Sequence, residues 1–148
     1  NVYGRYDNDI ERMERVIPLF IRSLRNGQPI TVYGREKILD FTYVDDCVAG
    51  VVAGIERLLD GRVVNQTINL AYGQGNSLVT LAEYIGEALG VEPQINIEPS
   101  KRVGEVSRYV ADISRANELL GYQPQVPLKE GVRRAVAWSL EWEQRTRH

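Results

Sequence analysis

The chain has 148 residues, of which 43% are hydrophobic and 26% are charged. A chain of this length and apolar content can bury one core of ordinary size, so we expect residues 1–148 to form one compact unit. Lysine and arginine together number 18 against 20 aspartates and glutamates, which gives a net charge of −2. Because the basic residues are scattered, this balance excludes nucleic acid and anionic membrane as bulk partners.

The numbers of cysteines and histidines limit which cellular compartment and which kinds of catalytic or metal site the sequence allows. Cys47 is the single cysteine, which excludes an internal disulfide and favours a reducing cytoplasm. His148 is the single histidine and the last residue, so we expect no His-based metal site and no Ser-His-Asp triad. The sequence has no apolar run long enough to cross a bilayer, and it opens on Asn1-Val2-Tyr3-Gly4 rather than on a signal peptide.

The first predicted elements are a helix and two strands. Apolar residues recur with helical spacing over residues 13–24, and the stripe ends at Asn26-Gly27. Pro18 must either open this helix or kink it. Residues 29–33 and 39–44 are short segments rich in β-branched and aromatic residues, which predicts two strands.

A second helix is predicted from Asp46 to about Leu59, with Asp45 as its cap. Over most of its length it lacks a polar face, and Gly50 and Gly54 would let another backbone approach closely. Such a helix should be covered on more than one side. If it is not covered within this chain, we expect exposed apolar surface and self-association, with a homodimer as the simplest outcome.

The rest of the chain continues the alternation. Turn and cap residues punctuate it, notably Ser77 and Gly90 around one helix and Pro127 before the last. The predicted elements are a strand at Thr67–Leu70, a helix at 78–89, a strand at Gln94–Ile97, a short helix capped by Asp112 and ending at Leu120, and a final helix that buries Val132, Ala135, Val136 and Trp142. Together these elements predict an α/β fold.

Two spacings imitate enzyme motifs. Tyr33 and Lys37 have the Tyr-x-x-x-Lys spacing of a short-chain dehydrogenase active site, but a strand ends at Gly34, and the pair needs a helix to share one face. Residues 73–77, Gly-Gln-Gly-Asn-Ser, imitate a dinucleotide loop but lack the third glycine and a following acidic residue. We interpret the first as a strand end and the second as a capped turn.

Several other segments form an ordered series. They are Asn1-Val2-Tyr3-Gly4, Thr31-Val32-Tyr33-Gly34, Asp40-Phe41-Thr42-Tyr43-Val44-Asp45, Asn69-Leu70 with Gly75-Asn76-Ser77, and Arg102-Val103-Gly104-Glu105 followed by Tyr109. In this order they resemble the C-terminal, substrate-binding half of the extended short-chain dehydrogenases, the NAD-dependent nucleotide-sugar epimerases and dehydratases. The resemblance extends over nearly the whole chain. It implies the substrate domain plus the last strand and helices of a doubly wound, Rossmann-type sheet, and it implies a UDP-glucose 4-epimerase most of all.

The resemblance also assigns substrate-binding roles. Asn1 would donate to the substrate diphosphate, and Thr31, Val32 and Tyr33 would hold the nucleotide base. Arg102 would bind the phosphates, Glu105 the ribose hydroxyls, and Tyr109 would lie beside the sugar. An arginine suits a diphosphate because its planar fork makes charge-assisted, often bidentate bonds. Read without the series, Arg102 and Glu105 are equally consistent with a surface ion pair worth under about 1 kcal/mol.

One position departs from the family pattern. Before the Asp-aromatic pair the family commonly has another phosphate-binding arginine, and this chain has Leu39. Leucine cannot bind phosphate. Either fewer cations hold the diphosphate, or Lys37 or Arg35 substitutes from the preceding turn, or the substrate seats its phosphates differently.

The resemblance implies a parent enzyme that uses NAD to epimerise C4 of a nucleotide sugar, with a UDP-hexose favoured by Glu105 over a dTDP-glucose. The glycine-rich cofactor loop and the helical catalytic pair are absent from this sequence. We therefore expect no catalytic residue, no bound NAD and no turnover in this chain alone. The alternatives are a nucleotide-sugar dehydratase or decarboxylase, a stand-alone nucleotide-sugar binding module, and an α/β domain that binds nothing.

Overall fold

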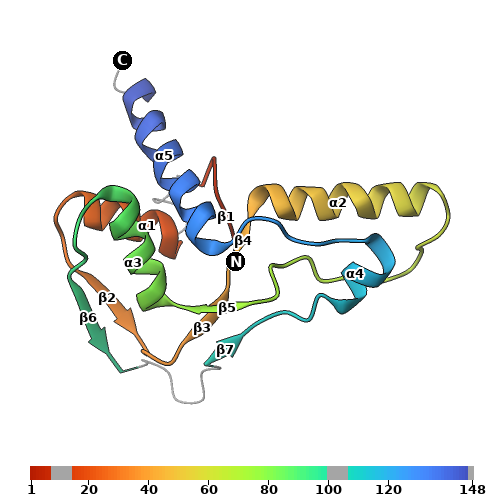
Figure 1. Cartoon of the computed structure of the whole chain (residues 1–148), viewed down its shortest axis with the longest axis horizontal. Coiled ribbons are helices and arrows are strands. Elements are labelled where there is room, and N and C mark those ends of the chain that lie inside the picture. Colours follow the sequence, from red (N-terminus) through yellow and green to blue (C-terminus); the bar gives the residue numbers. More distant parts are fainter. Residues whose placement is uncertain (8–14, 100–106, 147–148) are drawn as a thin grey trace.

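In a computed structural model of the chain, residues 1–7, 15–99 and 107–146 are described, and they form an elongated α/β molecule (Figure 1). Helices and strands alternate along this part of the chain. Its helices are α1 (Val16–Arg25), α2 (Val44–Leu59), α3 (Leu78–Leu89), α4 (Ser114–Leu120) and α5 (Leu128–Thr146). Its strands are β1 (Val2–Tyr3), β2 (Ile30–Tyr33), β3 (Ile38–Asp40), β4 (Thr42–Tyr43), β5 (Gly75–Ser77), β6 (Ile95–Glu98) and β7 (Arg108–Tyr109).

The strands pair in three small sheets, mostly in parallel. β1 pairs with β4, and β2 pairs with β6 so that Ile30 lies opposite Ile95. The third sheet has the order β5-β3-β7, with β5 antiparallel and β7 parallel to β3. β3 therefore lies at the centre of the sheet that joins the two ends of the molecule.

The larger hydrophobic core lies between α1, α3 and α5, with β1, β2 and β4 completing it. Of the predicted stripe of the first helix, Ile17, Phe20, Ile21 and Leu24 are buried, and the positions before Arg15 lie outside the described residues. Val132, Ala135 and Val136 of the last helix are buried as predicted. Pro18 is the third residue of α1, in the first turn, where its missing N–H leaves no bond unmade. It opens the helix rather than kinking it.

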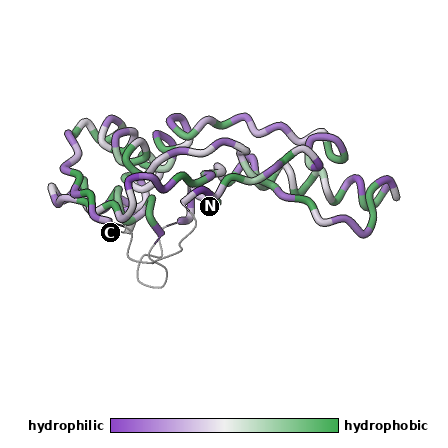
Figure 2. Tube along the Cα trace, turned by 90° about the horizontal axis from the view of Figure 1, so that it is seen from below, coloured by the Kyte–Doolittle hydropathy of each residue, from purple (hydrophilic) through white to green (hydrophobic). Residues whose placement is uncertain are grey.

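The opposite end of the molecule is thinner. There α2 lies over α4 and the segment at 65–70, and a second, smaller cluster forms around Ala116, Leu120 and Tyr122 (Figures 1 and 2). Only Asp46 and Gly50 of α2 are buried. Val44 and Ala53 are partly buried, but most of its other apolar side chains are exposed, among them Val48, Val51, Val52, Ile55, Leu58 and Leu59. The predicted covering on more than one side is not provided by the described residues.

Two buried carboxylates connect these parts. Asp40, 5% exposed, accepts hydrogen bonds from the backbone N–H groups of Tyr72 (3.2 Å), Gly73 (3.0 Å) and Ala111 (3.2 Å). Asp46, also 5% exposed, accepts from Gln125 and Val126, both at 2.9 Å. Each carboxylate thus fixes loops that are distant in sequence.

Several local predictions were wrong. Thr67–Leu70 forms no strand, because no neighbouring strand among the described residues supplies its hydrogen-bond ladder. The predicted strand at 39–44 is divided into β3 and β4 at Phe41. Asp45 does not cap α2, which begins one residue earlier; its carboxylate contacts Arg5 at 2.6 Å instead.

The ends of the last two helices also differ in part from expectation. Ser114 begins α4, and its backbone N–H donates to Asp112 at 2.8 Å, so the predicted cap acts one position further out. Trp142 is 37% exposed rather than buried, because the C-terminal end of α5 projects beyond the other elements and leaves it stacked on Trp138 (Figure 1). Among the described helices, none is both long enough and apolar enough to cross a membrane.

Asp40→Asn should lower the free energy of unfolding by about 1.5 to 3 kcal/mol, because the amide loses both the charge and one acceptor oxygen for three buried N–H groups. Chemical denaturation followed by circular dichroism measures this change. Asp45→Asn is the matched control, since its exposed pair with Arg5 contributes under about 1 kcal/mol. Equal effects of the two substitutions would show that Asp40 does not hold the loops together.

Candidate functional site

An open cavity of about 410 Å³ lies where β1, β3 and the start of α1 meet. Three residues named in the sequence analysis line it: Asn1, Lys37 and Leu39. The structure therefore brings the predicted diphosphate ligand Asn1 together with Leu39, which stands in place of the family's arginine, and with Lys37, a possible substitute for that arginine. The Asn1 side-chain nitrogen donates to the Asp40 carbonyl oxygen at 3.2 Å. Since an amide nitrogen carries two N–H groups, this bond orients Asn1 and leaves a second donor.

The cavity also contains an ion pair that the sequence analysis missed. Arg15 Nη1 lies 3.5 Å from an Asp7 carboxylate oxygen and donates to the Val2 carbonyl oxygen at 2.9 Å. Both Arg15 and Asp7 line the cavity. Burial raises the pKa of Asp7, and the Arg15 guanidinium opposes that rise. No sequence motif singles out Arg15, because only the fold brings it to the cavity that Lys37 also lines.

The predicted base-binding residues lie on β2, outside this cavity. Val32 is 1% exposed and belongs to the larger core, which leaves only its backbone for binding. Thr31 and Tyr33 are partly exposed and pair with Asn96 and Glu98 of β6. The structure therefore puts Thr31 and Tyr33 on the neighbouring strand pair but does not bring them into the cavity with Asn1.

Two of the predicted ligands, Arg102 and Glu105, lie outside the described residues. Tyr109, the last of the series, is on β7 and 51% exposed, directly opposite Leu39 in the register. Because Tyr109 pairs with Leu39, it lies next to β3, the strand on which leucine stands where the family commonly has arginine. These assignments stay predictions.

The two spacings that imitate enzyme motifs, Tyr33 with Lys37 and residues 73–77, have structural explanations. Tyr33 ends β2, and Lys37 follows a turn closed by its own N–H bond to the Gly34 carbonyl (3.1 Å), so the two do not share a helix face. A Cβ on Gly75 would lie 2.8 Å from Val110 Cγ2, which explains this glycine by close packing. Ser77 caps α3 by accepting the Thr80 N–H at 3.0 Å. The predicted cap at Ser77 is confirmed, but the predicted turn is wrong in part, because Gly75–Ser77 form β5 and pair with β3.

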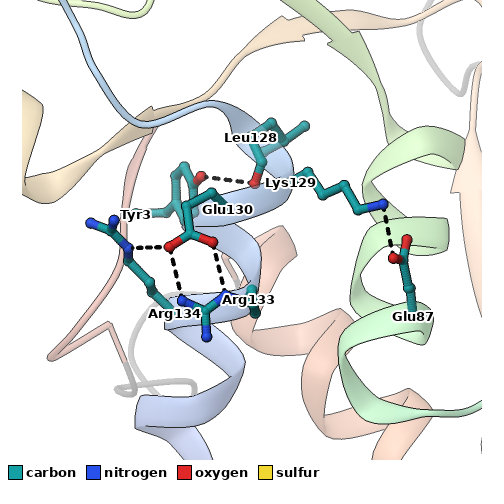
Figure 3. Close-up of polar contacts among 7 residues, drawn as sticks. All are labelled: Tyr3, Glu87, Leu128, Lys129, Glu130, Arg133 and Arg134. Carbon is teal, nitrogen blue, oxygen red and sulfur yellow. Dashed lines mark hydrogen bonds and ion pairs between the residues drawn. The ribbon is translucent and has the colours of Figure 1, made fainter.

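A separate polar cluster lies at the start of α5 (Figure 3). Glu130 accepts hydrogen bonds from Arg133 and Arg134, which lower its pKa to about 2, and Lys129 pairs with Glu87 of α3 at 2.8 Å. The pairs of Glu130 are at helical i,i+3 and i,i+4 spacing, the usual pattern of a solvated helix face, and the Lys129–Glu87 pair is an exposed ion pair between two helices. Among the described residues, no group of three or more His, Cys, Asp or Glu side chains could hold a metal ion.

Comparison with known proteins assigns these features to one group of enzymes. Residues 1–71 match the sequence profile described as the NAD dependent epimerase/dehydratase family. UDP-glucuronic acid decarboxylase 1 of Xenopus tropicalis is 35% identical over 123 residues, covering 82% of this chain and 28% of that protein. UDP-glucuronate 4-epimerase of Thermodesulfobacterium geofontis is 29% identical over 143 residues, covering 93% of this chain and 39% of that protein.

The fold comparison agrees. A crystal structure of UDP-glucuronic acid 4-epimerase from Bacillus cereus, in complex with UDP-glucuronic acid and NAD, superposes with a TM-score of 0.82 at 27% identity. The match covers 96% of this chain and 43% of that one. The predicted fold class, part of a Rossmann-type α/β enzyme, is confirmed. The chain spans 40% to 43% of the length of several curated relatives that it matches.

Proposed function

We propose that this chain, which belongs to the NAD-dependent epimerase/dehydratase family, is the substrate-binding portion of a UDP-hexose 4-epimerase. The observation that carries the proposal is the likeness over 96% of the chain to an epimerase whose structure contains UDP-glucuronic acid. Residues 1–148 would be the C-terminal part of that enzyme. The single cysteine, Cys47, supports the cytoplasm as its compartment.

The cavity bordered by Asn1, Lys37 and Arg15 supports a phosphate-binding role for this end of the molecule. Two cationic side chains and an amide donor suit the oxygens of a diphosphate, which stays charged at neutral pH. Thr31, Val32 and Tyr33 are proposed for the base, and Arg102, Glu105 and Tyr109 for the phosphates, ribose and sugar. Glu105 in particular favours a UDP-hexose over a dTDP-glucose.

The residues described do not fit NAD. Among the described residues, Gly73 and Gly75 precede α3, but Gly75–Ser77 form β5, which pairs antiparallel with β3, and Gly75 is packed closely against Val110. A dinucleotide site needs backbone N–H groups after a parallel strand to cradle the pyrophosphate. We therefore propose that NAD binds a part of the longer enzyme outside these 148 residues, and that this chain alone is inactive.

A decarboxylase or dehydratase of the same family is the second candidate. The relative at 35% identity is a UDP-glucuronic acid decarboxylase, which favours this reading for the sugar chemistry. Both candidates use the same kind of diphosphate site. They differ in the catalytic residues, which this sequence does not contain.

The purified chain should retain no NAD and should not interconvert UDP-glucose and UDP-galactose. The reason is the lack of a phosphate-cradling loop and of a helical tyrosine-lysine pair. Mass spectrometry of the denatured protein detects cofactor, and a coupled assay detects epimerisation. Stoichiometric NAD in the purified sample would contradict the proposed division of the enzyme.

UDP binding, although weak, should depend on Arg102 more than on Glu105. Arg102→Ala should lose about 1.5 to 3 kcal/mol of binding free energy, because it removes a charge-assisted bond to a phosphate. Glu105→Gln should be mild, since this carboxylate would contact neutral hydroxyls while lying near negative phosphates. Calorimetric titration of UDP compares the two variants. If Arg102→Ala leaves the UDP affinity unchanged, Arg102 does not bind the phosphates.

We further propose that the open face of α2 makes the chain self-associate, with a second copy as the partner. Val52 and Ile55, 48% and 51% exposed, lie on this face, and burying such a face is favourable at roughly 25 cal/mol per Å² of apolar surface. Light scattering of Val52→Asp/Ile55→Asp should show a smaller average mass than wild type. Val91→Asp, at an exposed apolar residue outside α2, is the control. A wild-type chain that stays monomeric at high concentration would refute the proposal.

A further inference from the structure

The sequence offers two residues, Lys37 and Arg35, that could replace the arginine missing at Leu39. The cavity at β1 and β3 favours one of them. Lys37 and Leu39 both line the cavity, whereas Arg35, exposed in the turn before them, is not among the residues that line it. Lys37 and Leu39 differ by two positions along the chain, and the turn brings the lysine to the cavity that the leucine borders. A long lysine stem can carry a charge over that distance.

Arg15 supplies a second cation from another element. It precedes α1 and borders the cavity together with Val16 and Ile17. Its bond to the Val2 carbonyl uses one of the five guanidinium N–H donors, so the contact orients the side chain and leaves others for an anion.

The start of α1 adds to the positive potential here. Arg15 occupies the N-cap position, no side chain caps the helix, and its first turn holds no acidic residue. Backbone N–H groups at an uncapped helix start attract anions, and the ten-residue helix adds its dipole. Apolar side chains also line the cavity, namely Leu39, Phe41 and Leu78. Water therefore screens the attraction between a cation and an anion less there than on a fully exposed surface.

We propose that Arg15 and Lys37 together replace the missing arginine at Leu39 as the cations that bind the substrate diphosphate. This inference rests on the proposed function and names the residues that carry its specificity for a charged phosphate group. Two cations from different elements line the cavity, and both would bind the diphosphate.

Asp7 sets the balance of charge at this site. Its carboxylate is 18% exposed and 3.5 Å from Arg15, and it lines the same cavity. It neutralises part of the positive charge and opposes an incoming phosphate. Removing its charge should therefore strengthen diphosphate binding, opposite to the effect of removing either cation.

The test is calorimetric titration of the 148-residue chain with UDP and, separately, with uridine. Arg15→Gln and Lys37→Gln should each lower UDP affinity by a factor on the order of ten, with uridine affinity unchanged. Both should flatten the dependence of UDP affinity on salt. Asp7→Asn should raise UDP affinity, and Leu39→Arg should restore it in the Lys37→Gln background. Arg35→Gln is the matched control, a cation of the same turn that is not among the residues lining the cavity, and circular dichroism checks that each variant is folded.

The outcomes separate this inference from the proposed function. If wild type binds UDP but Arg15→Gln and Lys37→Gln bind it equally well at low salt, these two residues are not the phosphate cations, although the proposed function stands. An equal loss in Arg35→Gln would reduce the effect to overall charge and overturn the assignment. If wild type binds neither UDP nor UDP-glucose, the proposed function fails, and this inference fails with it.

Discussion

Three segments that are far apart in the sequence meet at one buried carboxylate, that of Asp40. Its two oxygens accept backbone N–H groups from the loop at Tyr72-Gly73 and from Ala111, and these bonds fix the loops on either side of β3. A buried charge is tolerated only when it is fully hydrogen-bonded. Among the described residues, no buried side-chain nitrogen or oxygen lacks a partner. The position of β3, and of every residue on it, therefore depends on this one group.

The rest of the molecule is arranged around that strand. Leu39 precedes Asp40 and borders the cavity, while Asn1 donates to the Asp40 carbonyl and is oriented by the same strand. Asp46 repeats the arrangement at the start of α2, where it accepts the N–H groups of Gln125 and Val126. Asp40 and Asp46 are thus structural, because their carboxylates accept backbone N–H groups of distant loops.

The two ends of the molecule differ in how completely they bury themselves. α1, α3 and α5 enclose one core, with Leu81, Ile85 and Val132 at 0% exposure. α2 covers only a small cluster and leaves a row of apolar side chains open. A helix that is apolar on nearly all sides is stable in water only when something covers it. The end with α1, α3 and α5 buries its apolar side chains within the described part of the chain, while the α2 end leaves apolar side chains exposed.

The sequence by itself determined the α/β class, the faces of α1, α3 and α5, and the caps at Ser77 and Gly90, because these depend on local periodicity and backbone preference. It also predicted Asn1 as a substrate ligand and Lys37 or Arg35 as a substitute for the missing arginine, and the fold puts Asn1 and Lys37 at one cavity. Only the tertiary structure decided that Thr67–Leu70 has no strand partner among the described residues, that Trp142 is partly exposed, and that Asp45 contacts Arg5. It alone brought Arg15 and Lys37 to the same cavity. The physical reason is the same in each case: a partner distant in the sequence leaves no periodic trace in it, since only the fold sets which residues meet.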